Sequence, residues 1–251
     1  MKYKKKLSHL LHSMTSFIIL LIIGRLVNIL FTDMLSSSYL TGQLSFILSV
    51  AAAVVCFKIM PQDITPTANS SDDDYSDVPP AAKRSRTTSL LHTSIAFCTM
   101  VALMYVVSYF FGSDKAAEVK LSPIYLISLI IIHPVLEEYV FRNLYYSELR
   151  FLNPVFACLA QSTMFALSHD TVTGMFFALV CGIALGALVE NTGRWYCAIA
   201  AHAALNLRSL LFSTVLADNP IIRQQIDTAI IALGLASLVL LLVLQNRKSE
   251  A

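Results

Sequence analysis

Long apolar runs are the feature of this sequence that most restricts its fold. Several of them approach or exceed the roughly 20 residues that an α-helix needs to cross a bilayer. Only 14% of the 251 residues are charged, whereas a soluble domain carries roughly 25%. The period-two alternation that a membrane β-barrel requires is absent from the sequence. We therefore predict an all-α fold, a polytopic transmembrane helical bundle.

We expect about eight membrane-spanning helices. Their approximate ranges are 14–32, 39–59, 91–111, 121–147, 152–169, 172–190, 194–213 and 226–245. The first two fall within an N-terminal region at 1–60, the third shares 91–120 with a loop, and the last shares 214–251 with a cytoplasmic tail. The segment 61–90 is polar, with two adjacent prolines and runs of charge, which predicts a disordered cytoplasmic linker.

The distribution of lysine and arginine predicts the orientation of the chain. Four lysines precede the first span, and basic residues recur in the linker, at the turn near Arg150 and in the C-terminal tail. The positive-inside rule therefore places both termini in the cytoplasm. We interpret Lys83-Arg84-Ser85-Arg86 as a membrane anchor and expect no nucleic-acid partner. The short length and small loops favour a bacterial plasma membrane.

In three of the expected spans, ionisable and amide side chains form short patterns. A charge at the centre of a span costs roughly 2.5 to 3.5 kcal/mol on translocon scales, and such residues usually face the protein interior and have a function. In chain order these side chains are His133, Glu137, Glu138, Arg142, His169, His202 and Asn206. They form the patterns E-E-x-x-x-R, F-x-x-x-H and H-x-x-x-N. His133 fits no role that the sequence supports.

The two adjacent glutamates have different expected roles. Glu138 and Arg142 are four residues apart, so they share a helix face and can form an ion pair. Glu137 lies about 100° around the helix from Glu138, so the same arginine need not neutralise it. We therefore expect Glu137 to act as a general base and Glu138 to hold Arg142 as a structural partner within the catalytic set.

The histidines and the asparagine complete the predicted site. His202 and Asn206 share a helix face, and both can donate hydrogen bonds to an oxyanion as a peptide carbonyl becomes tetrahedral. His169 can orient or deprotonate water beside Glu137. Alternatively, Glu137, His169 and His202 can bind Zn²⁺, because one glutamate and two histidines are a sufficient ligand set. The H-E-x-x-H zincin signature is absent.

These three patterns, in this order, resemble the CPBP family, also called the Abi family. That family includes the type II CAAX prenyl endopeptidases and bacteriocin-processing or immunity proteins. The resemblance covers about 121–210, and we take 121–213 as the catalytic core. It implies an α-helical intramembrane protease, called a metalloprotease, whose metal dependence is disputed. The matching positions are Glu137, Glu138, Arg142, Phe165, His169, His202 and Asn206. The family commonly has glycine after the motif arginine, where this chain has Asn143.

We predict an intramembrane endopeptidase that acts on a peptide or a lipid-modified protein within membrane lipid. CAAX-type processing and bacteriocin or leader-peptide processing both fit the resemblance. A non-catalytic immunity or scaffold protein using the same cavity is the main alternative. A transporter with a proton relay through Glu137 and His169 ranks last, because no inverted repeat is apparent.

Overall fold

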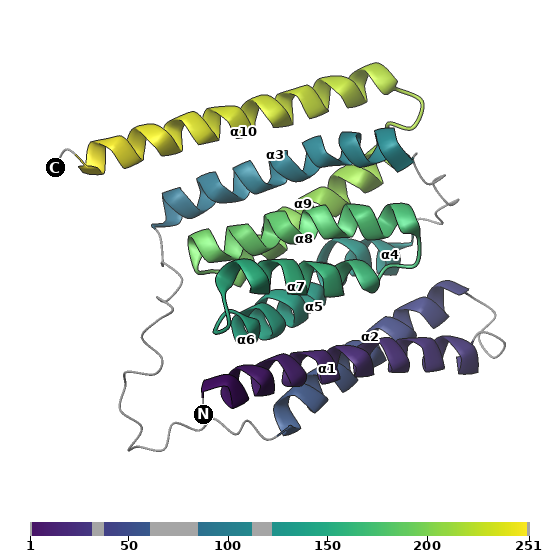
Figure 1. Ribbon diagram of the computed structural model, residues 1–251. Helices are drawn as coiled ribbons and strands as arrows, with labels where there is room; N and C mark the ends of the chain where they lie inside the picture. The colour runs from purple at the N-terminus through teal and green to yellow at the C-terminus, as the bar shows by residue number, and fades with distance from the viewer. Residues whose placement is uncertain (1, 32–37, 61–84, 112–121, 250–251) are drawn as a thin grey trace. The chain divides into compact units, whose positions relative to one another are not determined.

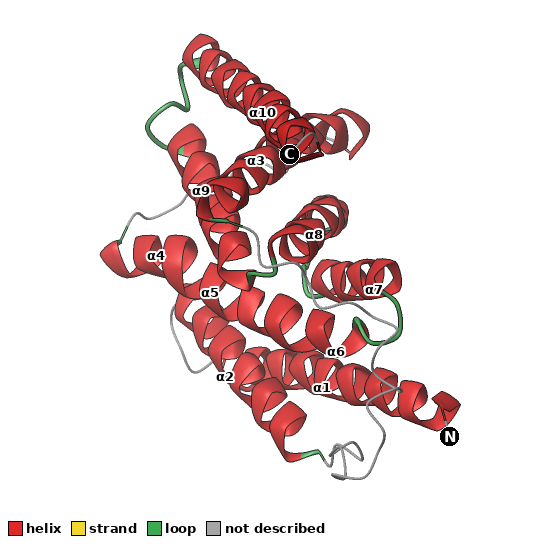
Figure 2. Ribbon diagram, turned by 90° about the vertical axis from the view of Figure 1, so that its left-hand side faces the viewer, coloured by secondary structure: helices red, strands yellow, loops and turns green. Residues whose placement is uncertain are grey.

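The computed structural model describes residues 2–31, 38–60, 85–111 and 122–249. Every regular element in these ranges is helical (Figures 1 and 2). In chain order they are α1 (Lys2–Phe31), α2 (Ser38–Ile59), α3 (Arg86–Phe111), α4 (Pro123–Ile127), η2 (Ser128–Ile132), α5 (His133–Glu138), η3 (Tyr139–Tyr146), α6 (Ser147–Leu149), α7 (Pro154–Leu167), α8 (Val172–Thr192), α9 (Trp195–Ser213) and α10 (Pro220–Ser249). The polytopic helical bundle predicted from the apolar runs is confirmed.

Among the described residues, six helices are long and apolar enough to cross a membrane. They are α1, α2, α3, the continuous run from α4 to α6, α8 and α10. Helix α7 is a shorter apolar helix, and α9 falls outside the six because His202, Asn206 and Arg208 lower its hydropathy. If the run from α4 to α6 is counted as one, the described residues form eight helical segments, in agreement with the expected number of about eight spans. Six of these segments have the length and hydropathy of a span.

The predicted linker differs from the structure at one end. Helix α3 begins at Arg86, so residues 86–90 of the segment expected to be disordered are helical. The hydroxyl oxygen of Ser85 accepts a hydrogen bond from the Thr88 N–H at 3.2 Å, which is the chemistry of a helix N-cap. Residues 61–84 lie outside the described residues.

The chain divides into two compact units. The first comprises Met1–Pro79 and Asn143–Ala160. In this unit α1 packs on α2 through small side chains: Ser45 donates to the Gly24 carbonyl at 2.6 Å, and Ser16 donates to the Ala53 carbonyl at 2.8 Å. Lipid tails are as apolar as the helix surfaces, so the hydrophobic effect does not drive helices together inside a bilayer. Membrane helices instead pack through close contacts and hydrogen bonds of this kind.

The second unit comprises Pro80–Arg142 and Gln161–Ala251. In it α3 lies beside α10 and also packs against α8 and α9 (Figure 1). Helix α9 also contacts α8, α5 and η2. Helix α8 begins where Thr171 accepts the Gly174 N–H at 3.0 Å and ends at Gly193, whose φ of 64° suits glycine. All the predicted site residues belong to this unit.

Candidate active site

The helical run from α4 to α6 is α-helical at the glutamates and π-helical on both sides of them. The π-helical turns are η2 and η3, and α5 between them carries both glutamates. The N–H of His133 donates to the Ser128 carbonyl, five residues back. Pro134 has no N–H for the next bond in this register. Pro134 is thus accompanied by π-helical turns, which are frequent at functional sites.

Glu138 is fully buried and joins two functional side chains. Its Oε1 accepts a hydrogen bond from Arg142 Nη1 at 3.1 Å, which confirms the predicted ion pair. The same oxygen lies 2.8 Å from Nδ1 of His202. Because an ionised carboxylate only accepts hydrogen bonds, His202 carries a proton on Nδ1 and directs Nε2 elsewhere. Glu138 therefore fixes the orientation of this imidazole as well as the arginine.

Arg142 is held from two further sides. Its Nη2 donates to the Gly182 carbonyl of α8 at 3.4 Å, and its guanidinium carbon lies 4.7 Å from the ring centroid of Phe165. Gln161 donates to the same Gly182 carbonyl at 3.1 Å. The sequence did not predict the role of Gly182, because a backbone carbonyl leaves no mark in a side-chain pattern. The side-chain amide of Gln161, inside an expected span, was the signal that was missed.

Glu137 faces two imidazoles and is partly open. Its Oε2 lies 3.7 Å from His202 Nε2, and its Oε1 lies 3.7 Å from His133 Nδ1. Both distances exceed ordinary hydrogen-bond lengths. Its side chain is 16% exposed, whereas that of Glu138 is 0% exposed. His133, which fits none of the predicted roles, is therefore a neighbour of the predicted base.

Phe165 connects the two predicted histidines. Its ring centroid lies 5.0 Å from that of His169 and 5.9 Å from that of His202, both edge-on. His169 lies just beyond the end of α7, and its Nδ1–H donates to the Phe165 carbonyl at 2.9 Å. This bond leaves Nε2 as the ring nitrogen of His169 that can exchange a proton.

Asn206 has a partner that the sequence did not predict. Its Nδ2 donates to the Leu129 carbonyl in η2 at 2.9 Å. In the π-helical register that carbonyl would be paired with residue 134, a proline without an N–H. The asparagine thus satisfies a carbonyl that Pro134 leaves open, and the second hydrogen on Nδ2 can still be donated.

The predicted zinc ligands do not form a ligand set as they are placed. In the part of the chain that the structure describes, no group of three or more His, Cys, Asp or Glu side chains is arranged to hold a metal ion. Glu137 lies near His202, but the set Glu137, His169 and His202 is not assembled around a common point. Metal dependence stays a prediction.

A second buried ion pair lies in the same unit, outside the predicted site. Both nitrogens Nε and Nη2 of Arg208 on α9 donate to the carboxylate of Asp227 on α10. The hydroxyl of Tyr105 on α3 donates to the same carboxylate. The sequence contained a signal for this ion pair. Arg208 is the charged residue of α9, and Asp227, in the apolar part of α10, carries the opposite charge.

The comparison with known families agrees with the motifs. Residues 119–208 match the family model described as "Type II CAAX prenyl endopeptidase Rce1-like". No curated protein and no solved structure matches the chain. The matched residues contain every predicted site residue, namely Glu137, Glu138, Arg142, His169, His202 and Asn206.

The match and the helices agree with each other. The six long apolar helices are those of an integral membrane protein, and the matched family is one of CAAX-type endopeptidases. Residues 119–208 of this membrane protein are therefore similar to the Rce1-like type II CAAX prenyl endopeptidase family.

Proposed function

We propose that this protein hydrolyses a peptide bond of a membrane-associated substrate, with Glu137 as the general base. The observation that carries the proposal is the difference between two adjacent carboxylates. Glu138 is closed off by Arg142 and His202. Glu137 is partly exposed, with its nearest described partners at 3.7 Å. Only Glu137 has both an open side and neighbouring groups that can carry a proton.

The reaction needs three contributions from the chain. Glu137 accepts a proton from a water molecule, and the water oxygen attacks the carbonyl carbon of the peptide bond. The developing oxyanion accepts hydrogen bonds from Nε2–H of a doubly protonated His202 and from the second Nδ2 hydrogen of Asn206. Glu137 then returns the proton to the leaving nitrogen as the C–N bond breaks.

The remaining residues support this chemistry. His169, with its Nδ1–H bound to the Phe165 carbonyl, is proposed to orient the water through Nε2. Glu138 holds His202 so that Nε2 points toward Glu137. Groups that orient a functional histidine in this way fix its tautomer as well as its direction.

The substrate class is also a proposal. The family resemblance favours a lipid-modified protein cut near its C-terminus, and bacteriocin or leader-peptide processing is the other substrate class. We further propose a bacterial plasma membrane location with both termini in the cytoplasm. Labelling of single cysteines introduced at each terminus, from each side of sealed vesicles, tests that orientation.

The decisive experiment compares Glu137→Gln with wild type in detergent, using a farnesylated CAAX peptide and an unmodified leader peptide. We expect Glu137→Gln to lower turnover by about 10²- to 10⁴-fold, the range of general-base catalysis, without changing the thermal midpoint of unfolding. Turnover unchanged by Glu137→Gln would refute the assignment. Cleavage of neither peptide, together with full activity of Glu137→Gln in cells, would favour an immunity or scaffold protein.

Metal dependence is tested on the same preparation. Zinc bound to wild type and lost in His169→Ala, with cleavage that a chelator stops, would establish a metalloprotease. Cleavage that resists the chelator but requires Glu137 would establish water activation by the carboxylate.

A further inference from the structure

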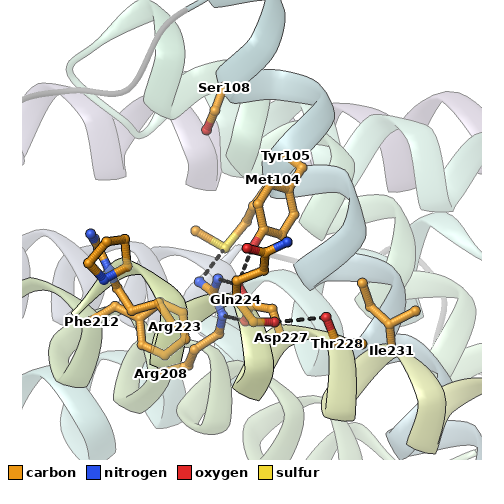
Figure 3. A pocket seen from close by; sticks show the side chains of 11 residues that line it. Met104, Tyr105, Ser108, Arg208, Phe212, Arg223, Gln224, Asp227, Thr228 and Ile231 are labelled. Atoms are coloured by element: carbon orange, nitrogen blue, oxygen red, sulfur yellow. Dashed lines mark hydrogen bonds and ion pairs between the residues drawn. The ribbon is translucent and has the colours of Figure 1, made fainter. Parts of the chain in front are cut away.

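A cavity of about 540 Å³ lies between α3, α9 and α10, all in the second unit. It is separate from the site around Glu137. On α9, Arg208 lies two residues beyond Asn206, which is about 200° around an α-helix. The cavity therefore occupies the side of α9 opposite to the one that bears Asn206 and contacts η2. Figure 3 shows its side chains, with Arg208, Asp227 and Tyr105 meeting at the centre and Ser108 apart from them.

The charges of the cavity do not cancel. Arg208 and Asp227 form a closed pair in which two guanidinium nitrogens bind the carboxylate. The third, Nη1, lies 3.3 Å from the sulfur of Met104, which is a weak acceptor. Arg223 also lines the cavity. Among the described residues it has no ion-pair partner, so the cavity keeps one net positive charge.

The position of the cavity in the membrane indicates what supplies the opposite charge. Its walls come from the last turns of α3 and α9 and the first turns of α10, which places it near one face of the bilayer. Tyr109 and Phe110, just beyond it on α3, are 84% and 71% exposed. Exposed aromatic side chains at the end of a span are typical of the headgroup level.

We propose that this cavity binds the phosphate headgroup of an anionic phospholipid, with Arg223 as the main contact. Arginine pairs well with phosphate oxygens, and Gln224 on the same wall supplies an amide donor. Met104, Phe212 and Ile231 provide apolar walls that suit the glycerol and the start of the acyl chains. Basic pockets between membrane helices on the cytoplasmic side of other membrane proteins bind anionic headgroups by the same chemistry.

The test uses the full chain, purified in a neutral detergent. Native mass spectrometry measures the apparent Kd for dioctanoyl phosphatidylglycerol, for dioctanoyl phosphatidylcholine and for inorganic phosphate as a competitor. We expect Arg223→Gln to weaken phosphatidylglycerol binding about fivefold, the effect of one basic side chain near a membrane surface. Phosphatidylcholine binding should not change.

Lys58→Gln is the control, because it removes one positive charge from an exposed lysine in the last turn of α2, outside the cavity. It should bind both lipids as wild type does. The proposal is overturned if Arg223→Gln binds phosphatidylglycerol like wild type, or if wild type binds phosphatidylcholine equally well. Displacement of the lipid by an equal concentration of inorganic phosphate would also overturn it, since the site would then be one for a free anion.

Discussion

The ion pair between Arg208 and Asp227 provides the sharpest test of what holds the second unit together. Asp227 is 1% exposed and Arg208 is 9% exposed. Asp227→Asn would keep the shape of the side chain and remove its charge, leaving Arg208 buried without a counter-charge. Breaking a buried pair by removing one partner costs about 3–5 kcal/mol. For a chain of this size, each kcal/mol lowers the thermal midpoint by about 2–4 °C.

We therefore expect Asp227→Asn to lower the midpoint by about 6–20 °C, combining those two ranges. Differential scanning fluorimetry of the purified protein in detergent measures this shift. The double variant Arg208→Leu with Asp227→Leu should recover most of the loss, because replacing a whole buried pair by apolar side chains is often neutral. Tyr105→Phe removes one hydrogen bond to the carboxylate and should cost only about 1 kcal/mol.

The comparison of single and double variants can refute this reasoning. If Arg208→Leu and Asp227→Leu each destabilise the protein and the double variant shows the sum, the two residues act independently. If Asp227→Asn leaves the midpoint unchanged, the charge of Arg208 is compensated by solvent or lipid. Either result would contradict a closed pair between α9 and α10.

Three further predictions concern packing and the site. Glu138→Gln should lower turnover about 10- to 100-fold, the usual effect of losing a residue that orients a functional histidine, measured per folded molecule; unchanged turnover would contradict the proposed role. Gly182→Ala should lower the free energy of unfolding by about 1–3 kcal/mol, because a Cβ there would meet the Cβ of Ser162 at 2.9 Å. A variant that unfolds at the wild-type temperature would contradict this close packing. Glu148→Ala should lower the free energy of unfolding by about 1–3 kcal/mol, since the Glu148 carboxylate contacts His9 at 2.6 Å and His12 at 3.2 Å. Turnover per folded molecule should stay the same, because Glu148 is not part of the proposed site.

Three of the predicted residues, Glu138, Arg142 and His202, are in direct contact. The spacing of Glu138 and Arg142 alone places them on one helix face, and their pair is present at 3.1 Å. The contact between Glu138 and His202 joins residues 64 apart in the chain. No helical period predicts it, because it depends on how α9 packs against α5.

The sequence by itself determined the helices, since runs of apolar side chains long enough to span a bilayer have few other solutions. It also determined which polar residues share a face, because the helical repeat is fixed. Only the tertiary structure decided the partners of those residues: His202 for Glu138, the Leu129 carbonyl for Asn206, and Asp227 for Arg208. The physical reason is that hydrogen bonds and ion pairs extend over a few ångströms, and which spans approach that closely is decided by helix packing.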